Sequence, residues 1–96
     1  MSKFYVKVAC DLDIEWSGST APVYRVYVNE ELFTERAWLW RNHNAVEIIQ
    51  IHAPSGKYVI SHQLVNPRNT VMNVSNFRVL EGPGKFKNDD NVLRIL

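Results

Sequence analysis

The fold is decided by one stretch near the N-terminus, which reads Phe4-Tyr5-Val6-Lys7-Val8-Ala9-Cys10-Asp11-Leu12-Asp13-Ile14-Glu15-Trp16. Every second side chain from Phe4 to Trp16 is apolar, and most of the side chains between them are polar or charged. A period of two places each set on its own face of an extended strand, whereas a helix would scatter the apolar set around its circumference. The stretch therefore predicts a long strand with one buried face, bent or bulged near residues 9–11.

The rest of the chain consists of short β-rich runs separated by residues that favour turns. Further strands are predicted over residues 23–28, 32–40, 46–52, 58–65, 71–80 and 92–96. The separators are rich in Gly, Pro, Asn and Ser, and Asn29-Glu30 is a plausible tight turn. Seven to eight strands at roughly ten-residue spacing, with no convincing long helix, predict an all-β antiparallel β-sandwich, jelly-roll-like or Ig-like.

Two segments allow more specific predictions about pairing and faces. The run Pro54-Ser55-Gly56-Lys57 separates two β-rich stretches, so residues 46–52 and 58–65 are predicted to form a hairpin. Residues 32–40 carry large apolar groups on both alternating faces, which leaves open which face is buried. Residues 30–37 could also form one or two helical turns.

Length, charge and cysteine content exclude several classes of protein. The chain has 96 residues, enough for a single β-sandwich domain over residues 1–96. Eleven basic and ten acidic residues are interspersed and give a net charge of +1, so no basic stripe predicts binding to nucleic acid. Apolar runs are too short to cross a membrane. The N-terminal residues do not resemble a signal peptide, and Cys10 is the only cysteine, so we expect a protein that is not secreted.

No arrangement of residues predicts catalysis or a cofactor. Cys10 shares the apolar face of the first strand and is expected to pack in the core as a small hydrophobic residue. His52 and His62 lie on the two arms of the predicted hairpin, about 10–13 Å apart at strand rise, which is too far for one metal ion. Asp11 and its neighbouring carboxylates are expected on the solvated face of a strand. The chain is therefore predicted not to be an enzyme and to hold no metal or cofactor.

The surplus of aromatic residues is the main functional signal. A thin core cannot hold every large apolar side chain, and aromatic groups beside arginines are typical of interfaces between proteins. The residues predicted to bind a partner are Tyr27, Arg36, Trp38, Trp40 and Arg41. The alternative is that one face assignment is wrong by a residue, which would return the aromatic groups to the core.

Part of the chain resembles a known class of sugar-binding domain. The run Tyr24-Arg25-Val26-Tyr27-Val28-Asn29-Glu30-Glu31-Leu32, with the later Ala53-Pro54-Ser55-Gly56-Lys57-Tyr58, is similar to the strand–turn–strand pattern of xylan-binding-type carbohydrate-binding modules. The resemblance covers residues 23–65 and implies a jelly roll that stacks exposed aromatic groups on sugar rings. No acidic cluster matches the calcium loop of that family.

As a whole, the chain resembles the small stand-alone β proteins of tailed bacteriophages. That resemblance implies a non-catalytic structural or interaction protein, such as a capsid decoration or tail accessory protein. Its partner would be a protein, either further copies of the chain or a capsid or tail lattice, and its location the virion or the host cytoplasm. A carbohydrate-binding module that uses exposed aromatic groups is the alternative.

Overall fold

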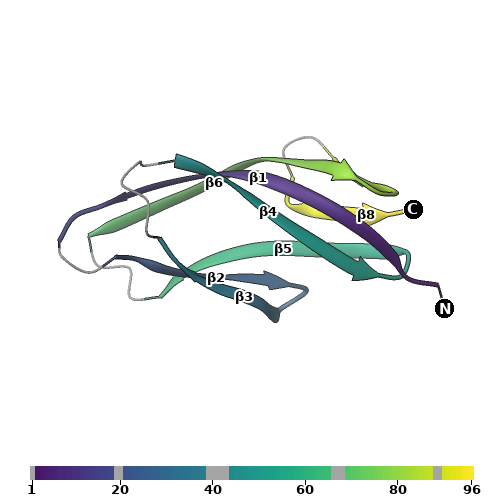
Figure 1. Ribbon diagram of the computed structural model, residues 1–96, viewed down its shortest axis with the longest axis horizontal. Helices are drawn as coiled ribbons and strands as arrows, with labels where there is room; N and C mark the ends of the chain where they lie inside the picture. The colour runs from purple at the N-terminus through teal and green to yellow at the C-terminus, as the bar shows by residue number, and fades with distance from the viewer. Residues whose placement is uncertain (1, 19–20, 39–43, 66–68, 88–89) are drawn as a thin grey trace.

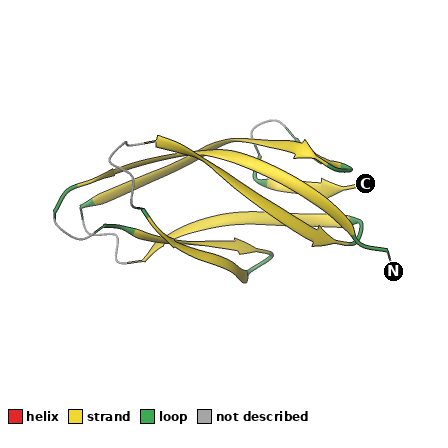
Figure 2. Cartoon of the chain, viewed as in Figure 1, coloured by secondary structure: helices red, strands yellow, loops and turns green. Residues whose placement is uncertain are grey.

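The computed structural model describes residues 2–18, 21–38, 44–65, 69–87 and 90–96, and in these ranges the chain forms strands and no helix (Figure 1, Figure 2). The described strands are β1 (Phe4–Trp16), β2 (Val23–Val28), β3 (Glu31–Ala37), β4 (Asn44–Ala53), β5 (Gly56–Val65), β6 (Thr70–Glu81), β7 (Gly84–Phe86) and β8 (Val92–Ile95). Nothing in these ranges forms a helix of the length and apolar character that membrane crossing requires.

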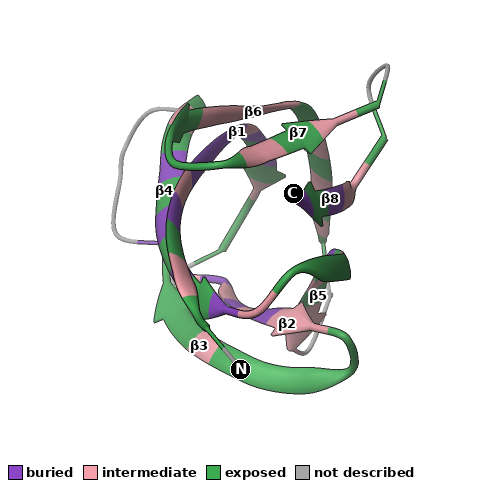
Figure 3. Cartoon of the chain, turned by 90° about the vertical axis from the view of Figure 1, so that its right-hand side faces the viewer, coloured by how far each residue is buried: buried purple, intermediate pink, exposed green. Residues whose placement is uncertain are grey.

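The strands form two antiparallel sheets that pack against each other. One sheet has three strands in the order β4-β1-β6, and the other has five in the order β3-β2-β5-β8-β7. Seen from one end, the two sheets surround a common interior where the buried positions lie (Figure 3). The predicted all-β antiparallel sandwich is thereby confirmed, with eight strands among the described residues.

Strand β1 supplies much of the core, as its alternating pattern predicts. Its even-numbered residues from Val6 to Ile14 are all buried, while Asp13 and Glu15 are exposed. The pairing of β1 with β4 is regular, but its pairing with β6 shifts register between Lys7 and Val8 and again between Ala9 and Asp11. The predicted irregularity near residues 9–11 is therefore present. The additional residues lie on β6, where Asn76 has a φ of 57°.

The turn predicted at Asn29-Glu30 is confirmed. Both residues have positive φ, 50° and 68°, which suits the tight turn of a two-residue hairpin between β2 and β3. Asn29 stabilises the turn through its side chain, because its Oδ1 accepts a hydrogen bond of 2.7 Å from the Val59 amide.

The prediction that residues 46–52 and 58–65 form a hairpin is wrong. Strand β4 pairs with β1, whereas β5 pairs with β2 and β8 in the opposite sheet. The chain at Pro54-Ser55 therefore crosses from one sheet to the other, and turn residues alone do not distinguish that crossing from a hairpin. In consequence His52 lies opposite Tyr5 on β1, and His62 lies opposite Val26 on β2.

Candidate functional site

The residues predicted to bind a partner do not form one surface. Tyr27 lies on the outer face of β2, partly exposed, opposite the exposed Leu32 of β3. Arg36 lies on β3, opposite the buried Tyr24, and its Nη1 forms an ion pair of 3.2 Å with Oε2 of Glu47. Arg36 therefore connects the edge strands β3 and β4 through its partly exposed side chain and is not part of a surface around Tyr27.

Trp38 is not available to a partner, so this part of the prediction is wrong. Its side chain is 1% exposed, and its ring packs edge-on against Tyr24 at 6.5 Å. Arg36 lies opposite the buried Tyr24, and Trp38 is two residues further along, so regular alternation turns the indole to the same inward side. Trp40 and Arg41 lie outside the described residues.

A cluster of polar side chains lies inside the sandwich around Glu47. This residue is buried on the inner face of β4, and its Oε2 accepts a hydrogen bond of 2.7 Å from the Tyr24 hydroxyl as well as the contact with Arg36. Burial and then the hydrogen bond to Glu47 raise the pKa of Tyr24, so its hydroxyl stays protonated. Oε1 of Glu47 has no hydrogen-bond partner among the described residues.

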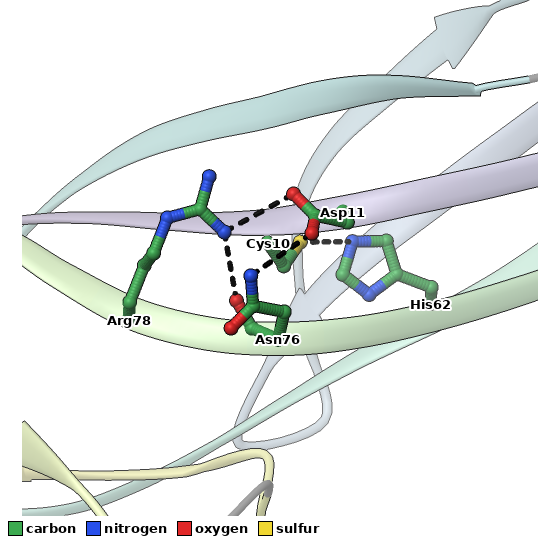
Figure 4. A network of polar contacts seen from close by, with 5 residues as sticks. All are labelled: Cys10, Asp11, His62, Asn76 and Arg78. Atoms are coloured by element: carbon green, nitrogen blue, oxygen red, sulfur yellow. Dashed lines mark hydrogen bonds and ion pairs between the residues drawn. The ribbon is translucent and has the colours of Figure 1, made fainter.

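A cysteine and a histidine meet in the same interior. Figure 4 shows the Cys10 Sγ directed at Nε2 of His62, and the two atoms lie 3.9 Å apart. Burial, followed by the negative charge of Glu47, raises the pKa of the Cys10 thiol to about 12. Burial, followed by the positive charge of Arg36, lowers the pKa of His62 to about 4. At neutral pH the contact therefore joins a neutral thiol to a neutral imidazole, not a thiolate to an imidazolium.

The outer face of the three-stranded sheet is ionic between β1 and β6. Asp11, next to Cys10 on β1, points to the opposite side and accepts hydrogen bonds from Asn76 at 3.0 Å and Arg78 at 3.1 Å (Figure 4). These two hydrogen bonds lower the pKa of Asp11. Lys7 and Glu81 form a further contact of 3.8 Å across the same two strands. Charged groups therefore occupy this half of the face.

The other half of that face has a different character. The outward side chains of β4 are Val46, Ile48, Gln50 and His52, which we call the β4 strip. Val46 is 54% exposed and Ile48 is 48% exposed, and the strip contains no carboxylate, ammonium or guanidinium group. The β4 strip extends onto β1 at Tyr5, which is 61% exposed. The Tyr5 ring stacks on the His52 ring, with the two ring centroids 4.0 Å apart. The strip and Tyr5 thus form an exposed stretch with large apolar and aromatic side chains and without an ion pair of its own among the described residues.

Grooves separate β4 from β3 at both ends of β4. One groove, of about 360 Å³, is lined by Leu32 and Phe33 of β3 and by Ile51 and Ala53 of β4. The other, of about 410 Å³, is lined by Arg36 of β3 and by Ala45 and Glu47 of β4. The open edge of β4 therefore borders space that the described residues leave empty.

Sequence reasoning missed both the β4 strip and the burial of Glu47, although a signal was present. Residues 46–52 alternate so that Glu47 falls in step with Ile49 and Ile51, and Val46 falls in step with Ile48. Both faces of this strand are apolar, and one of them must face outward in a sandwich. The described residues contain no group of three or more His, Cys, Asp or Glu side chains placed to hold a metal ion.

Comparison with known proteins does not assign the chain to a family. No family model matches the chain, and neither the curated proteins nor the solved structures searched include one similar to it.

Proposed function

We propose that this chain is a non-catalytic structural or interaction protein that binds a protein assembly through strand β4. The observation that carries the proposal is the β4 strip, an apolar and uncharged stretch beside an ionic half of the same sheet face. Apolar groups left outside on a small domain are typical of protein-binding surfaces. An accessory role in a virus particle is the specific case that the resemblance of the sequence to phage proteins suggests.

The state of the Cys10–His62 contact supports a role without catalysis. A nucleophilic cysteine needs a low pKa and access to substrate. Cys10 is buried, and burial raises its pKa to about 12, while His62 is too weak a base to accept its proton.

Carbohydrate binding has less support. Trp38 is buried and cannot stack on a sugar, and Trp16 is partly buried against the core. Tyr27 remains partly exposed on the outer face of the other sheet, apart from the β4 strip.

The test compares two lysine substitutions on the outer face of the same sheet. Ile48→Lys places a charge in the β4 strip, and Val71→Lys places one at a similarly exposed position on β6. A protein assembly that co-sediments with the wild type and with Val71→Lys, but not with Ile48→Lys, supports the proposal. Binding unchanged by Ile48→Lys contradicts it. A change in tryptophan fluorescence on titration with soluble xylan would instead favour the carbohydrate alternative.

A further inference from the structure

The four sheet edges differ in how they are protected against pairing with another chain. Natural proteins block such edges with charged side chains, bulges, very short strands or covering segments. Strand β3 carries Glu31, Glu35 and Arg36 and has an irregular pairing with β2. Strand β6 has two register shifts, and β7 has only three residues. Three of the four edges therefore carry at least one recognised device.

Strand β4 has none of these devices among its described features. It is 10 residues long, contains no proline, and pairs with β1 without a register shift. Its only Asp, Glu, Lys or Arg residue is Glu47, which is turned inward and paired with Arg36. A long, regular and uncharged edge strand presents a row of backbone N–H and C=O groups that can accept another strand.

We propose that β4 pairs antiparallel with β4 of a second copy of this chain, so that the two three-stranded sheets join across a two-fold axis. This inference rests on the proposed function, because it names the protein that occupies the β4 strip. The occupant would be a strand whose outward face is largely apolar and lacks carboxylate, ammonium and guanidinium groups, and the outward face of β4 itself has that composition. A two-fold contact needs a surface that is complementary to itself.

Charge and register both allow this self-pairing. An uncharged strip meets its own copy without the repulsion that like charges opposite each other would cause. Pairing must keep outward residues opposite outward residues, because directly opposite side chains share a face and a shift by one residue would place the exposed Ile48 opposite the buried Ile49 of the second copy. Registers that satisfy this and also avoid placing Glu47 opposite its own copy include those that put Ile48 opposite Ile48 or Gln50 of the second copy. Glu47 then lies opposite Ile49 or Ile51, not opposite its own copy.

The expected dimer is weak. One strand edge with its flanking side chains covers less than the roughly 800 Å² per partner that a stable protein interface buries. We therefore expect monomers at low micromolar concentration and dimers at hundreds of micromolar. An association of this strength would not appear at one dilute concentration, so the test requires a concentration series.

The first measurement is the mass of the purified chain by light scattering over that series. We expect the wild type and Val71→Lys to approach twice the monomer mass, and Ile48→Lys to remain monomeric. Circular dichroism and thermal unfolding establish that both variants are folded. Equal association of Ile48→Lys and Val71→Lys, or association that continues beyond a dimer, overturns the proposal.

The second measurement locates the contact by amide hydrogen exchange of the wild type at both ends of the series. The proposal expects the gain in protection at high concentration to be confined to residues 44–53 and their flanks. Protection gained elsewhere, for example over β3 or β6, overturns it. If the chain is a monomer throughout while Ile48→Lys still abolishes binding to the assembly, self-pairing fails and the proposed function stands. If Ile48→Lys changes neither the association of the chain with itself nor its binding to the assembly, both the self-pairing and the proposed function fail.

Discussion

The imidazole of His62 lies between the two sheets, near Tyr24 and Phe77 and 3.9 Å from the Cys10 thiol. Its pKa falls from 6.5 to about 4 on folding, because burial disfavours the charged ring. Between these values the unfolded chain binds a proton that the folded chain does not. The free energy of unfolding therefore falls as the pH is lowered from 6.5 toward 4, and the contribution of His62 is fully present only above pH 6.5. We expect a loss of about 2 kcal/mol, after allowing for the partial exposure of the ring.

Denaturant unfolding at several pH values checks this prediction. His62→Leu removes the titrating group and should flatten the free energy of unfolding between pH 6.5 and 4. Ile60→Val, on the same face of β5, should lower stability at every pH and leave that slope intact. An unchanged slope in His62→Leu would show that another group is responsible. Asp11 does not account for this slope, because its pKa lies below 3.8 in the folded chain and its titration changes the free energy of unfolding at lower pH.

Glu47 is a second residue whose environment has a measurable effect. One oxygen of its buried carboxylate has no hydrogen-bond partner in the part of the chain that the structure describes, and the other accepts from Tyr24 and Arg36. Tyr24→Phe removes one of these donors and should reduce the free energy of unfolding by about 2 kcal/mol. Tyr5→Phe, at an exposed ring, should change it by less than about 0.5 kcal/mol. Equal effects from both substitutions, measured by urea unfolding, would contradict a specific role for the Tyr24 hydroxyl.

At the scale of elements, the link from β6 to β7 depends on Gly82. This residue has a φ of 100°, and a Cβ added there would collide with the backbone carbonyl of Tyr5. Gly18 has a similar φ of 113° but lies in open space. Gly18→Ala should therefore cost about 1 kcal/mol from backbone strain, and Gly82→Ala about 3 kcal/mol, because β1 must also move. Thermal unfolding of both variants tests the difference, and equal losses would exclude the steric contribution.

The elements themselves were largely predictable, but their partners were not. The alternation from Phe4 to Trp16 is a local property, so the strand and its buried face follow from the sequence. Whether the chain at Pro54-Ser55 turns back within one sheet or crosses to the other depends on contacts far away in the sequence. The burial of Trp38 depends on which face of residues 32–40 meets the other sheet, and large apolar groups on both faces hide that choice in the sequence. The candidate surface could have been inferred only by noticing that both faces of residues 46–52 are apolar.

At the scale of the whole molecule, charge contributes little to association between copies. The net charge is +1, and the β4 strip contains no carboxylate, ammonium or guanidinium group. We therefore expect the dissociation constant of the dimer to stay constant or fall as salt is raised, because screening acts on charges and salt strengthens apolar burial. Light scattering at low and high ionic strength measures this. A dissociation constant that rises steeply with salt would indicate ionic contacts, such as those near Arg78, in place of the apolar strip.

The central position of β1 determines when this protein can fold during its synthesis. Both neighbours of β1 are made after it, and its pairing with β6 runs from Trp16 opposite Thr70 to Lys7 opposite Glu81. The ribosome adds residues from the N-terminus at about 5–20 per second, so β1 waits several seconds for its second neighbour. A nascent chain that ends before residue 70 thus leaves the β6-facing edge of β1 unpaired, on the strand that supplies the most buried core residues. The sheet is completed only after residue 81 has been made, and a chain that stops before residue 70 leaves a fragment prone to aggregate.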